Sequence, residues 1–529
     1  MESPDFAPDA VTEKSRALSP TAGSPPAKLP PGRLVPWAQG CVLVALYAAS
    51  AILCLRIASV SDPDAWWHLR AGEWIMQHFA VPQTDPFSSF GAGKPWVAYS
   101  WLYELLIFQL FQKLGLVGIV AYTTGMAVAV TVFLHRMIRR LQADFTFAVL
   151  LTAVACSCMI RLDAPRPWWF TILYFVMELD LLMQARKTGK IRGLLWLPLI
   201  FALWANLHIQ FIDGLVVLAI ALAESVLARR WTVIQTRMRP GRLCGIFVAC
   251  LLAPLANPYG WRIYQVAYDL AAQPGVMNKV GELTALPFRS LDDWLLLLLL
   301  VAAVAVLARA RRFALFEILL LAFAVVVTFR SQRDLWVGVV VASAILAAEL
   351  TGNDKNRFQL TASAVPFVAV ATALIVSLGM LFLHVNNARL GTDLARGMPV
   401  RAVEVVKEKG WSGPLYNDYT WGGYLIWALR MPVTIDGRAA LYGDERIYRS
   451  DDTWNGRPDW ASDPDLQKAG LVIGPVKASL TQLLRMDPRF ELAYEDKLAA
   501  VFVARRSLPS GAAESPAAAG SMADHAAVK

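Results

Sequence analysis

Eleven apolar runs between residues 36 and 384 constrain this chain more than any other feature. The first covers about 22 residues, long enough to cross a hydrocarbon layer ~30 Å thick and too long for a signal-peptide core. The others lie at about 116–138, 145–160, 168–185, 194–209, 211–228, 243–257, 293–308, 313–329, 335–350 and 362–384. Only 17% of the residues are charged and the mean hydropathy is +0.45, which excludes a soluble multidomain enzyme. We therefore expect a polytopic α-helical membrane protein with about eleven transmembrane helices.

Basic residues divide unequally between the two sides of this layout. With the N-terminus in the cytoplasm, the inner connections hold 17 Lys and Arg residues and the longer outer connections hold nine. The inner ones lie in segments 136–140, 186–192, 229–242, 309–312 and 355–357. This positive-inside pattern accounts for most of the net charge of +9 without a nucleic-acid partner. It predicts an integral protein of the inner (plasma) membrane with an extracytoplasmic C-terminal domain.

The composition changes at both ends of the apolar region. The Pro-, Ala- and Ser-rich leader and the Ala/Ser/Gly/Pro tail are too poor in large apolar residues to form a core. We expect a disordered cytoplasmic leader at 1–35, a transmembrane domain at 36–385, an extracytoplasmic α/β domain at 386–506 and a disordered tail at 507–529.

Two long outer loops, at 59–115 and 258–292, interrupt the transmembrane domain. In the first loop the stretch 101–113 is apolar but short and contains Glu104. Such a stretch favours a helix lying in the membrane interface over a further span.

Alternating helix and strand signals predict that the C-terminal domain is α/β. We expect strands at the segments GPLYND, PVTID, LVIGP, FELAY and AAVFVA. We expect helices at about 398–409, 419–430 and 477–487.

The first outer loop contains a pair of carboxylates, Asp62 and Asp64, directly after the first apolar run. Carboxylates at the membrane surface can accept a proton from an attacking hydroxyl, or together hold a divalent cation such as Mg²⁺ or Mn²⁺. The alternative is a solvated turn, because Asp and Pro are common turn residues.

The order of elements in this loop resembles the glycosyltransferase C superfamily, which uses polyprenyl-phosphate sugars and includes protein O-mannosyltransferases and aminoarabinose transferases. The matching residues are Asp62 and Asp64, then Gly93-Lys94-Pro95, then the segment 101–113. The resemblance implies an inverting transferase with Asp64, or Asp62, as the base and Lys94 facing the donor phosphate. The chain has D-P-D where the family typically has an acidic D-E pair, so the choice of base stays open.

A second resemblance lies in the C-terminal domain. The run Asn417 to Tyr424, NDYTWGGY, followed by Ile435-Asp436-Gly437-Arg438, is similar to the W-W-D-Y-G element of oligosaccharyltransferase catalytic subunits. It also resembles a run found in bacterial members of the superfamily that have no assigned substrate. The residues that this implies for acceptor binding or structure are Asp418, Tyr419, Trp421, Asp436 and Arg438. The alternative is a strand–turn–helix junction whose glycines permit close packing.

Arginines flank several apolar runs on the outer side, where cations are scarce. They are Arg161, Arg166, Arg330 and Arg333. Arginine is well suited to holding phosphate at a lipid–water boundary, and negative charge grows on the phosphate as a sugar leaves it. Together with Lys94 and His68, these residues predict a donor-phosphate site. Interfacial snorkelling or helix-end pairing, such as Arg333 with Asp334, is the alternative.

Two further polar residues, His208 and Asp85, are candidates for acceptor binding or a structural role. No P-loop, G-x-S-x-G, H-E-x-x-H or Cys/His zinc spacing occurs in the sequence, so no cofactor is required by a motif. The leading hypothesis is a transferase that moves a sugar from a polyprenyl-phosphate donor in the bilayer to an extracytoplasmic acceptor. A transporter or an envelope scaffold with a partner-binding outer domain is the alternative.

Overall fold

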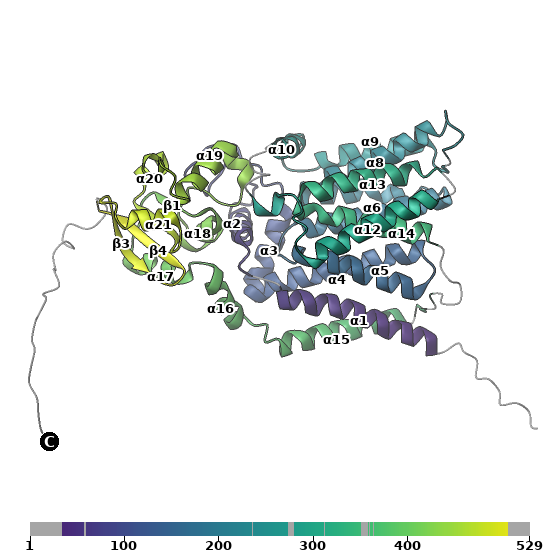
Figure 1. Cartoon of the computed structure of the whole chain (residues 1–529), viewed down its shortest axis with the longest axis horizontal. Coiled ribbons are helices and arrows are strands. Elements are labelled where there is room, and N and C mark those ends of the chain that lie inside the picture. Colours follow the sequence, from purple (N-terminus) through teal and green to yellow (C-terminus); the bar gives the residue numbers. More distant parts are fainter. Residues whose placement is uncertain are drawn as a thin grey trace, which may run out of the picture.

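The computed structural model describes residues 34–505 except 58–59, 235, 273–279, 311–312, 351–357, 359 and 363. The predicted tail, and all but the last two residues of the predicted leader, lie outside the described residues. The described chain is mostly helical, with a bundle of apolar helices at one end and a small sheet at the other (Figure 1).

Each of the eleven predicted apolar runs forms a helix. They are α1 (Leu34–Ile57), α4 (Leu116–Leu141), α5 (Phe145–Cys158), α6 (Trp168–Thr188), α7 (Leu197–Leu207), α8 (Phe211–Leu227), α9 (Pro240–Leu252), α12 (Leu291–Arg309), α13 (Leu315–Arg330), α14 (Leu335–Glu349) and α15 (Ala364–Phe382). Among the described residues, α1, α4, α12 and α15 are long and apolar enough to cross a membrane. The other seven are shorter or more charged, so eleven crossings stay a prediction.

Helix α14 forms the centre of the bundle. Every residue from Leu335 to Ala347 is buried, and the helix packs on α4, α5, α12 and α13. A helix that is apolar on all sides is typical of a bundle core. Gly338 lies against Thr328 of α13 without room for a β-carbon, which is the close approach that small residues permit between membrane helices.

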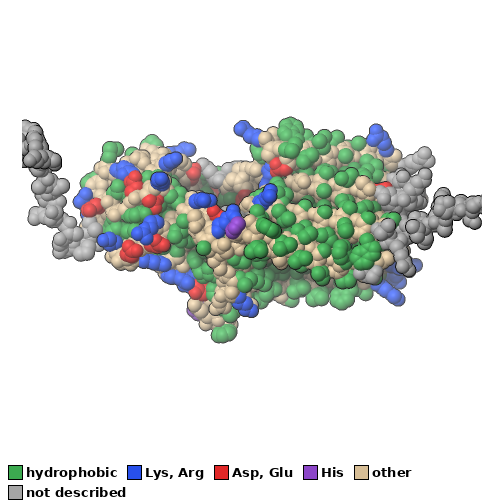
Figure 2. All heavy atoms as spheres, turned by 90° about the horizontal axis from the view of Figure 1, so that it is seen from below, with side chains coloured by type: hydrophobic (Ala, Val, Ile, Leu, Met, Phe, Trp, Pro, Cys, Tyr) green, Lys and Arg blue, Asp and Glu red, His purple; other side chains and the backbone are tan. Residues whose placement is uncertain are grey.

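The bundle and the sheet end have different surfaces. Figure 2 shows hydrophobic side chains over the helices and charged side chains gathered over the C-terminal part on this face. Large apolar side chains that are more than half exposed include Leu150, Leu298, Val326, Val370 and Leu381. An apolar surface of this extent is typical of a protein embedded in lipid and atypical of a soluble monomer.

The first outer loop folds into two helices, α2 (Pro63–His78) and α3 (Trp101–Leu114), which lie between the bundle and the sheet end (Figure 1). A β-carbon at Gly72 of α2 would overlap the carbonyl of Glu104 in α3, so glycine permits this close crossing. The predicted helix at 101–113 is thus confirmed, and its position in a membrane interface stays a prediction.

Short helices complete several of the connections between the longer helices. They are η1 (Ile160–Leu162), η2 (Arg192–Trp196), η3 (Ala253–Leu255), α10 (Arg262–Ala271), η4 (Gly281–Leu283) and η5 (Gln332–Asp334). Helix α10 lies in the second outer loop beside the junction of the two ends (Figure 1).

The C-terminal part is a four-stranded mixed sheet with helices around it. Its strands are β1 (Leu415–Asn417), β2 (Leu471–Pro475), β3 (Phe490–Glu495) and β4 (Ala499–Ala504), in the order β1-β2-β4-β3. Strands β1 and β2 are parallel, and the other two pairs are antiparallel. The helices are α16 (Asn387–Gly397), α17 (Val400–Lys409), η7 (Tyr419–Trp421), α18 (Gly422–Leu429), α19 (Ala439–Trp454), η8 (Trp460–Ser462), α20 (Pro464–Lys468) and α21 (Ser479–Leu484).

Four of the five predicted strands and all three predicted helices are confirmed, whereas the strand predicted at PVTID is wrong. This segment forms a single bridge between Val433 and Ser88 of the first outer loop. The Val433 carbonyl accepts from the backbone N–H of Ser89 (2.9 Å), and its N–H donates to the carbonyl of Phe87 (3.1 Å). The segment therefore joins the two outer parts of the chain and does not extend the sheet.

Candidate active site

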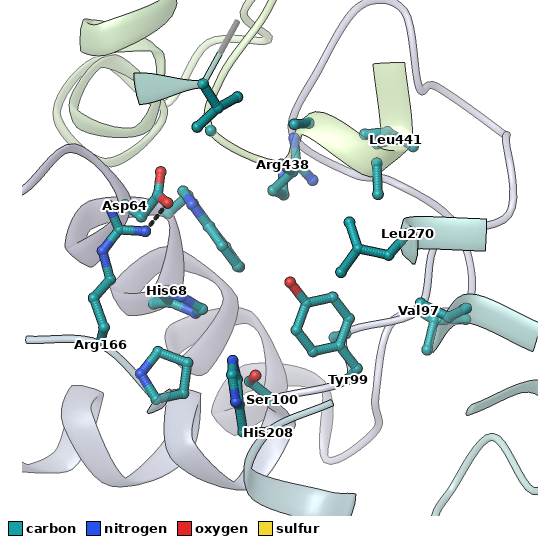
Figure 3. A pocket seen from close by; sticks show the side chains of 18 of the residues that line it. Asp64, His68, Val97, Tyr99, Ser100, Arg166, His208, Leu270, Arg438 and Leu441 are labelled. Atoms are coloured by element: carbon teal, nitrogen blue, oxygen red, sulfur yellow. Dashed lines mark hydrogen bonds and ion pairs between the residues drawn. The ribbon is translucent and has the colours of Figure 1, made fainter. Parts of the chain in front are cut away.

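A cavity of about 600 Å³ lies where the bundle, both outer loops and the C-terminal part meet. Its charged and imidazole side chains are Asp62, Asp64, His68, Glu104, Arg166, His208, Arg262, Asp269, Glu282, Arg333 and Arg438. Figure 3 shows Asp64 and Arg166 on one side of the cavity and Leu270 and Leu441 on the other. A concave site with a polar side and an apolar side is the expected location for binding a substrate that has both characters.

The start of α2 positions the acidic pair. Asp62 caps the helix, and its Oδ1 accepts hydrogen bonds from the backbone N–H groups of Asp64 (3.0 Å) and Ala65 (3.1 Å). Pro63 occupies the first helical position, where its fixed φ is favourable and its missing N–H is not needed. The side chains of Asp62 and Asp64 are only 11% and 13% exposed, so the pair is not a solvated turn.

Arg166 joins three carboxylates at this side of the cavity. Its Nε lies 2.9 Å from Asp62 Oδ2, its Nη1 contacts Asp64, and its Nη2 lies 3.6 Å from Glu282 Oε2. The guanidinium therefore holds Asp64 in one orientation and compensates part of the negative charge that burial would otherwise penalise.

Two tyrosine hydroxyls fix the backbone around Arg166. The hydroxyl of Tyr103 donates to the carbonyl of Pro165 (2.5 Å), and the hydroxyl of Tyr122 donates to the carbonyl of Arg166 itself (2.8 Å). The segment RLDAPRPWW thus forms a rigid turn before α6, because Pro165 and Pro167 also restrict the backbone.

Burial raises the pKa of Asp64 to about 6, against the lowering effect of the Arg166 guanidinium and with further raising by Asp62 and Glu282. A carboxylate with a pKa near 6 is ionised at pH 7 and is still a better proton acceptor than an exposed aspartate. Asp64 therefore has the properties of a general base.

The C-terminal part closes the cavity over this carboxylate. A β-carbon at Gly437 would overlap Asp64 Oδ1, and one at Gly423 would overlap the carbonyl of Pro63. Both glycines belong to the two motifs singled out in the C-terminal domain. The NDYTWGGY and IDGR segments thus pack on the helix start that carries the acidic pair, and only glycine permits this approach.

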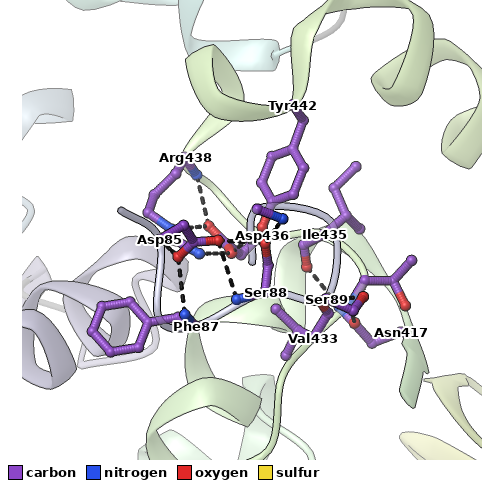
Figure 4. Close-up of polar contacts among 12 residues, drawn as sticks. Asp85, Phe87, Ser88, Ser89, Asn417, Val433, Ile435, Asp436, Arg438 and Tyr442 are labelled. Carbon is purple, nitrogen blue, oxygen red and sulfur yellow. Dashed lines mark hydrogen bonds and ion pairs between the residues drawn. The ribbon is translucent and has the colours of Figure 1, made fainter. Parts of the chain in front are cut away.

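A buried network of charges fixes the IDGR segment on the first outer loop (Figure 4). Arg438 Nη1 donates to Asp85 Oδ1 (2.5 Å) and Nη2 donates to Asp436 Oδ2 (2.7 Å), with both acids fully buried. The Tyr442 hydroxyl also donates to Asp436. Removal of one partner would leave a buried charge uncompensated, so the network holds the two outer parts together.

Two histidines and a tyrosine form the floor of the cavity (Figure 3). His68 Nδ1 lies 3.2 Å from Glu104 Oε1, and His208 Nδ1 lies 2.8 Å from the Thr171 hydroxyl. Burial lowers the pKa of His68 well below its usual value and raises that of Glu104 to about 8. Figure 3 shows the hydroxyl of Tyr99 directed into the cavity above them.

Two more arginines line the cavity. Arg333 lies 3.9 Å from Glu282 and 3.6 Å from Asp334, which are loose ion pairs. Arg262 begins α10 and has no side-chain ion pair or hydrogen bond to any described residue. These two guanidinium groups have more donors free for a ligand than Arg166 has.

The predicted site residues divide into two groups. Those that line the cavity are Asp62, Asp64, His68, Arg166, His208, Arg333, Tyr419 and Arg438. Those that do not are Asp85, Lys94, Arg161, Arg330, Asp418, Trp421 and Asp436. The structure thus brings together the acidic pair, two of the four outer arginines and the end of the IDGR motif.

Several of the predicted site residues that do not line the cavity make other contacts. Lys94 Nζ lies 3.2 Å from the centre of the Phe90 ring, a cation–π contact. Arg161 pairs with Asp292 and Asp293 at the start of α12. The Trp421 indole N–H donates to the carbonyl of Gly397 (3.0 Å), which favours a structural role for Trp421.

The sequence allows a divalent cation to bind between Asp62 and Asp64, and the geometry of the site tests this. No group of three or more His, Cys, Asp or Glu side chains suited to a metal ion is found among the described residues. A cation on Asp62 and Asp64 would have to displace the Arg166 guanidinium from both carboxylates. The side chains as arranged do not fit Mg²⁺ or Mn²⁺, and no step below involves a metal.

Sequence reasoning gave no role in the site to Tyr99, Glu104, Arg262 or Glu282, and it named Gly437 only as part of the IDGR motif. The outer position of Arg262 and Glu282 in a long loop was the only signal available for them. Nothing in the sequence around Tyr99 or Gly437 indicated that these residues line the same cavity as Asp62 and Asp64.

Among the comparisons with known proteins, only the one with solved structures gives matches. No protein-family model and no curated protein sequence matches the chain. One of the solved structures that match is ArnT from Cupriavidus metallidurans bound to undecaprenyl phosphate, with 14% sequence identity. The match covers 89% of this chain and 99% of that chain, with a TM-score of 0.42. This score is too low to establish a shared fold, and the proposals below rest on the residues of this chain.

Proposed function

We propose that the protein is an inverting glycosyltransferase that moves a sugar from a polyprenyl-phosphate donor to an extracytoplasmic acceptor. The observation that supports this best is Asp64, a buried carboxylate with a raised pKa, in a cavity of about 600 Å³ at the end of an apolar helical bundle. The resemblance of the first outer loop to the glycosyltransferase C superfamily supports the same class of donor.

The cavity has a surface for each part of such a donor. Its apolar side, which includes Val97, Leu270 and Leu441, suits the isoprene unit next to the phosphate. The guanidinium groups of Arg262 and Arg333 suit the phosphate, because arginine binds phosphate oxygens with several parallel hydrogen bonds. The reaction then takes place at the polar side of the cavity, which contains Asp64.

The proposed reaction is a single displacement. The acceptor hydroxyl attacks the anomeric carbon of the sugar from the face opposite the phosphate, and its proton passes to a carboxylate oxygen of Asp64. The bond between the anomeric carbon and the phosphate oxygen breaks, and the electron pair leaves with the phosphate. Arg262 and Arg333 stabilise the negative charge that grows on this leaving group.

Arg166 and Gly437 act on the base and not on the substrate. The guanidinium of Arg166 keeps Asp64 oriented and lowers its pKa against the effect of burial. The backbone at Gly437 covers one oxygen of Asp64, so this carboxylate is shielded from water on that side. A base that is oriented before the substrate arrives needs little reorganisation during the reaction.

The test is turnover of defined donors by the purified protein in proteoliposomes. Undecaprenyl phosphates that carry glucose, mannose, galactose, arabinose or aminoarabinose are supplied with an envelope fraction as acceptor, and released undecaprenyl phosphate is measured. We expect at least one donor to be consumed with transfer of its sugar. A protein that neither binds undecaprenyl phosphate nor consumes any of these donors would contradict the proposal.

A further inference from the structure

The floor of the cavity has hydrogen-bonding groups that the proposed reaction does not use. His68, His208 and Ser100 are 3%, 5% and 1% exposed, and all three line the cavity with Tyr99. Figure 3 shows His68, Ser100 and His208 on the side of the space opposite Leu441, with Tyr99 beside them and below Leu270 in this view. Buried polar groups are normally satisfied within the protein, so a set that faces a cavity indicates a ligand.

The orientation of the His208 ring is fixed by its neighbours. The Trp204 indole N–H donates to the Thr171 hydroxyl (2.8 Å), and this hydroxyl lies 2.8 Å from His208 Nδ1. Since Thr171 accepts from Trp204, its own proton is available to His208 Nδ1. No described residue pairs with His208 Nε2, so this nitrogen is available to a ligand, as a donor when Thr171 donates to Nδ1 and as an acceptor when Nδ1 donates to Thr171.

The ring of His68 is held in a similar way. Its Nδ1 pairs with Glu104, while its face lies on the ring of Trp67 at a centroid distance of 3.5 Å. Glu104 Oε2 has no partner among the described residues, which fits a carboxyl group that keeps its proton. His68 Nε2 is thus a second neutral hydrogen-bonding group that the protein leaves unpaired.

Tyr99 and Ser100 add hydroxyl groups beside these rings. The Tyr99 hydroxyl makes no hydrogen bond to a described residue, and the Ser100 hydroxyl is buried without a partner. Trp67 and Trp96, which also line the cavity, provide aromatic rings near the same space. Several neutral donors and acceptors beside aromatic rings suit a ligand with many hydroxyl groups and apolar C–H faces.

The charge of a phosphate is better matched by the guanidinium groups of Arg262 and Arg333, which line the same cavity, than by these neutral side chains. An ammonium or carboxylate group on the ligand would find no charged partner among His68, His208, Tyr99 and Ser100 themselves. The floor therefore fits a polar ligand without charge.

We infer that His68, His208, Tyr99 and Ser100 form the subsite for the transferred sugar, and that this sugar is uncharged. The inference rests on the proposed function and makes it more specific. It places the sugar under Asp64 and beside the leaving phosphate, which is where an acceptor activated by Asp64 would reach the anomeric carbon.

The test compares binding of undecaprenyl phosphate alone with binding of the same lipid bearing glucose, mannose, galactose, arabinose or aminoarabinose. The variants are Tyr99→Phe, which removes one hydroxyl, and Tyr99→Phe/His208→Gln; Tyr268→Phe, on the exposed face of α10, is the control. For the preferred donor we expect affinity to fall about three- to tenfold in the single variant and further in the double. Binding of undecaprenyl phosphate alone should stay within about twofold in both, which also shows that they fold.

Each outcome is decisive. A neutral-sugar donor that binds more tightly than the bare lipid, with this gain lost in the variants, supports the subsite. Three results would overturn the subsite and leave the transferase proposal standing. They are equal losses of affinity for the bare lipid and the donor, no loss of affinity in either variant, and a preference for the aminoarabinose donor. Failure of the wild-type protein to bind undecaprenyl phosphate at all would instead contradict the proposed function, and the subsite with it.

Discussion

The α-carbon of Gly437 lies against the carboxylate of Asp64, with no room between them for a side chain. The two residues belong to the two motifs that the sequence singled out, one in the first outer loop and one in the C-terminal domain. Their contact means that the C-terminal domain forms one wall of the cavity that contains the proposed base. It is therefore part of the candidate active site and not an appended module.

This contact predicts the effect of Gly437→Ala. The added methyl group overlaps Asp64 Oδ1, so either the carboxylate or the IDGR segment must move. Because a misplacement of about 1 Å can cost roughly 10²-fold in rate, we expect a loss of that order in kcat. The control is Gly391→Ala in α16, where a β-carbon has no neighbour within 4 Å. Wild-type turnover in Gly437→Ala would show that the contact is not needed.

The pH dependence of turnover follows from the pKa of Asp64. The proposed base works only when ionised, and its pKa is raised to about 6. Turnover should therefore be level above this pH and fall about tenfold per pH unit below it. Arg166 lowers this pKa, so in Arg166→Gln the decline should begin at a higher pH. An acid limb in the same position in wild type and variant would argue against Asp64 as the titrating group.

The buried network around Arg438 predicts a loss of stability in Asp85→Asn. The variant leaves the Arg438 guanidinium, 3% exposed, with one carboxylate fewer. Loss of one partner from a buried pair costs about 3–5 kcal/mol, so the melting temperature in detergent should fall clearly. The exposed pair Arg401 and Glu404 is the matched control, and Glu404→Gln should leave the melting temperature nearly unchanged. Equal effects of both variants would mean that the network does not hold the domains together.

Arg262 and Lys94 should differ in their effect on lipid binding. Arg262 lines the cavity and has no ion pair to a described residue, whereas Lys94 lies outside the lining with its ammonium on Phe90. Arg262→Gln should weaken binding of undecaprenyl phosphate about tenfold or more, because it removes charge-assisted hydrogen bonds. Lys94→Ala should leave binding within about twofold. The opposite order would favour the interpretation of G-x-K-P as a phosphate element.

The local parts of this fold could be predicted from the sequence. The eleven runs that became α1, α4 to α9 and α12 to α15 are apolar over helical lengths, and the strands LVIGP and AAVFVA are apolar and β-branched, so their form depends on nearby residues alone. PVTID has the same local character, but its partner is Ser88 of the first outer loop. A local pattern does not specify which distant segment supplies the hydrogen bonds, which is why this strand was predicted wrongly.

The candidate site was predictable only in part for the same reason. The chemistry of Asp62, Asp64 and Arg166 is visible in their residue types and outer position. Their neighbours are not: Arg438 and Asp85 pair across 353 residues of sequence. Lys94 is a further example of what residue type alone does not predict. Its ammonium group contacts the nearby Phe90 ring, and this local contact competes with the predicted contact to phosphate.

The most direct test of the central claim is transfer of labelled sugar in proteoliposomes by Asp64→Asn. This change keeps the shape of the side chain and removes the proton acceptor, so turnover should fall about 10²–10⁴-fold while binding of undecaprenyl phosphate is retained. Asp62→Asn should be milder, because asparagine also caps a helix, and the exposed Glu408→Gln in α17 is the control. We predict that Asp64→Asn loses nearly all transfer activity and still binds the lipid. Full transfer activity in the double variant Asp62→Asn/Asp64→Asn would contradict this account.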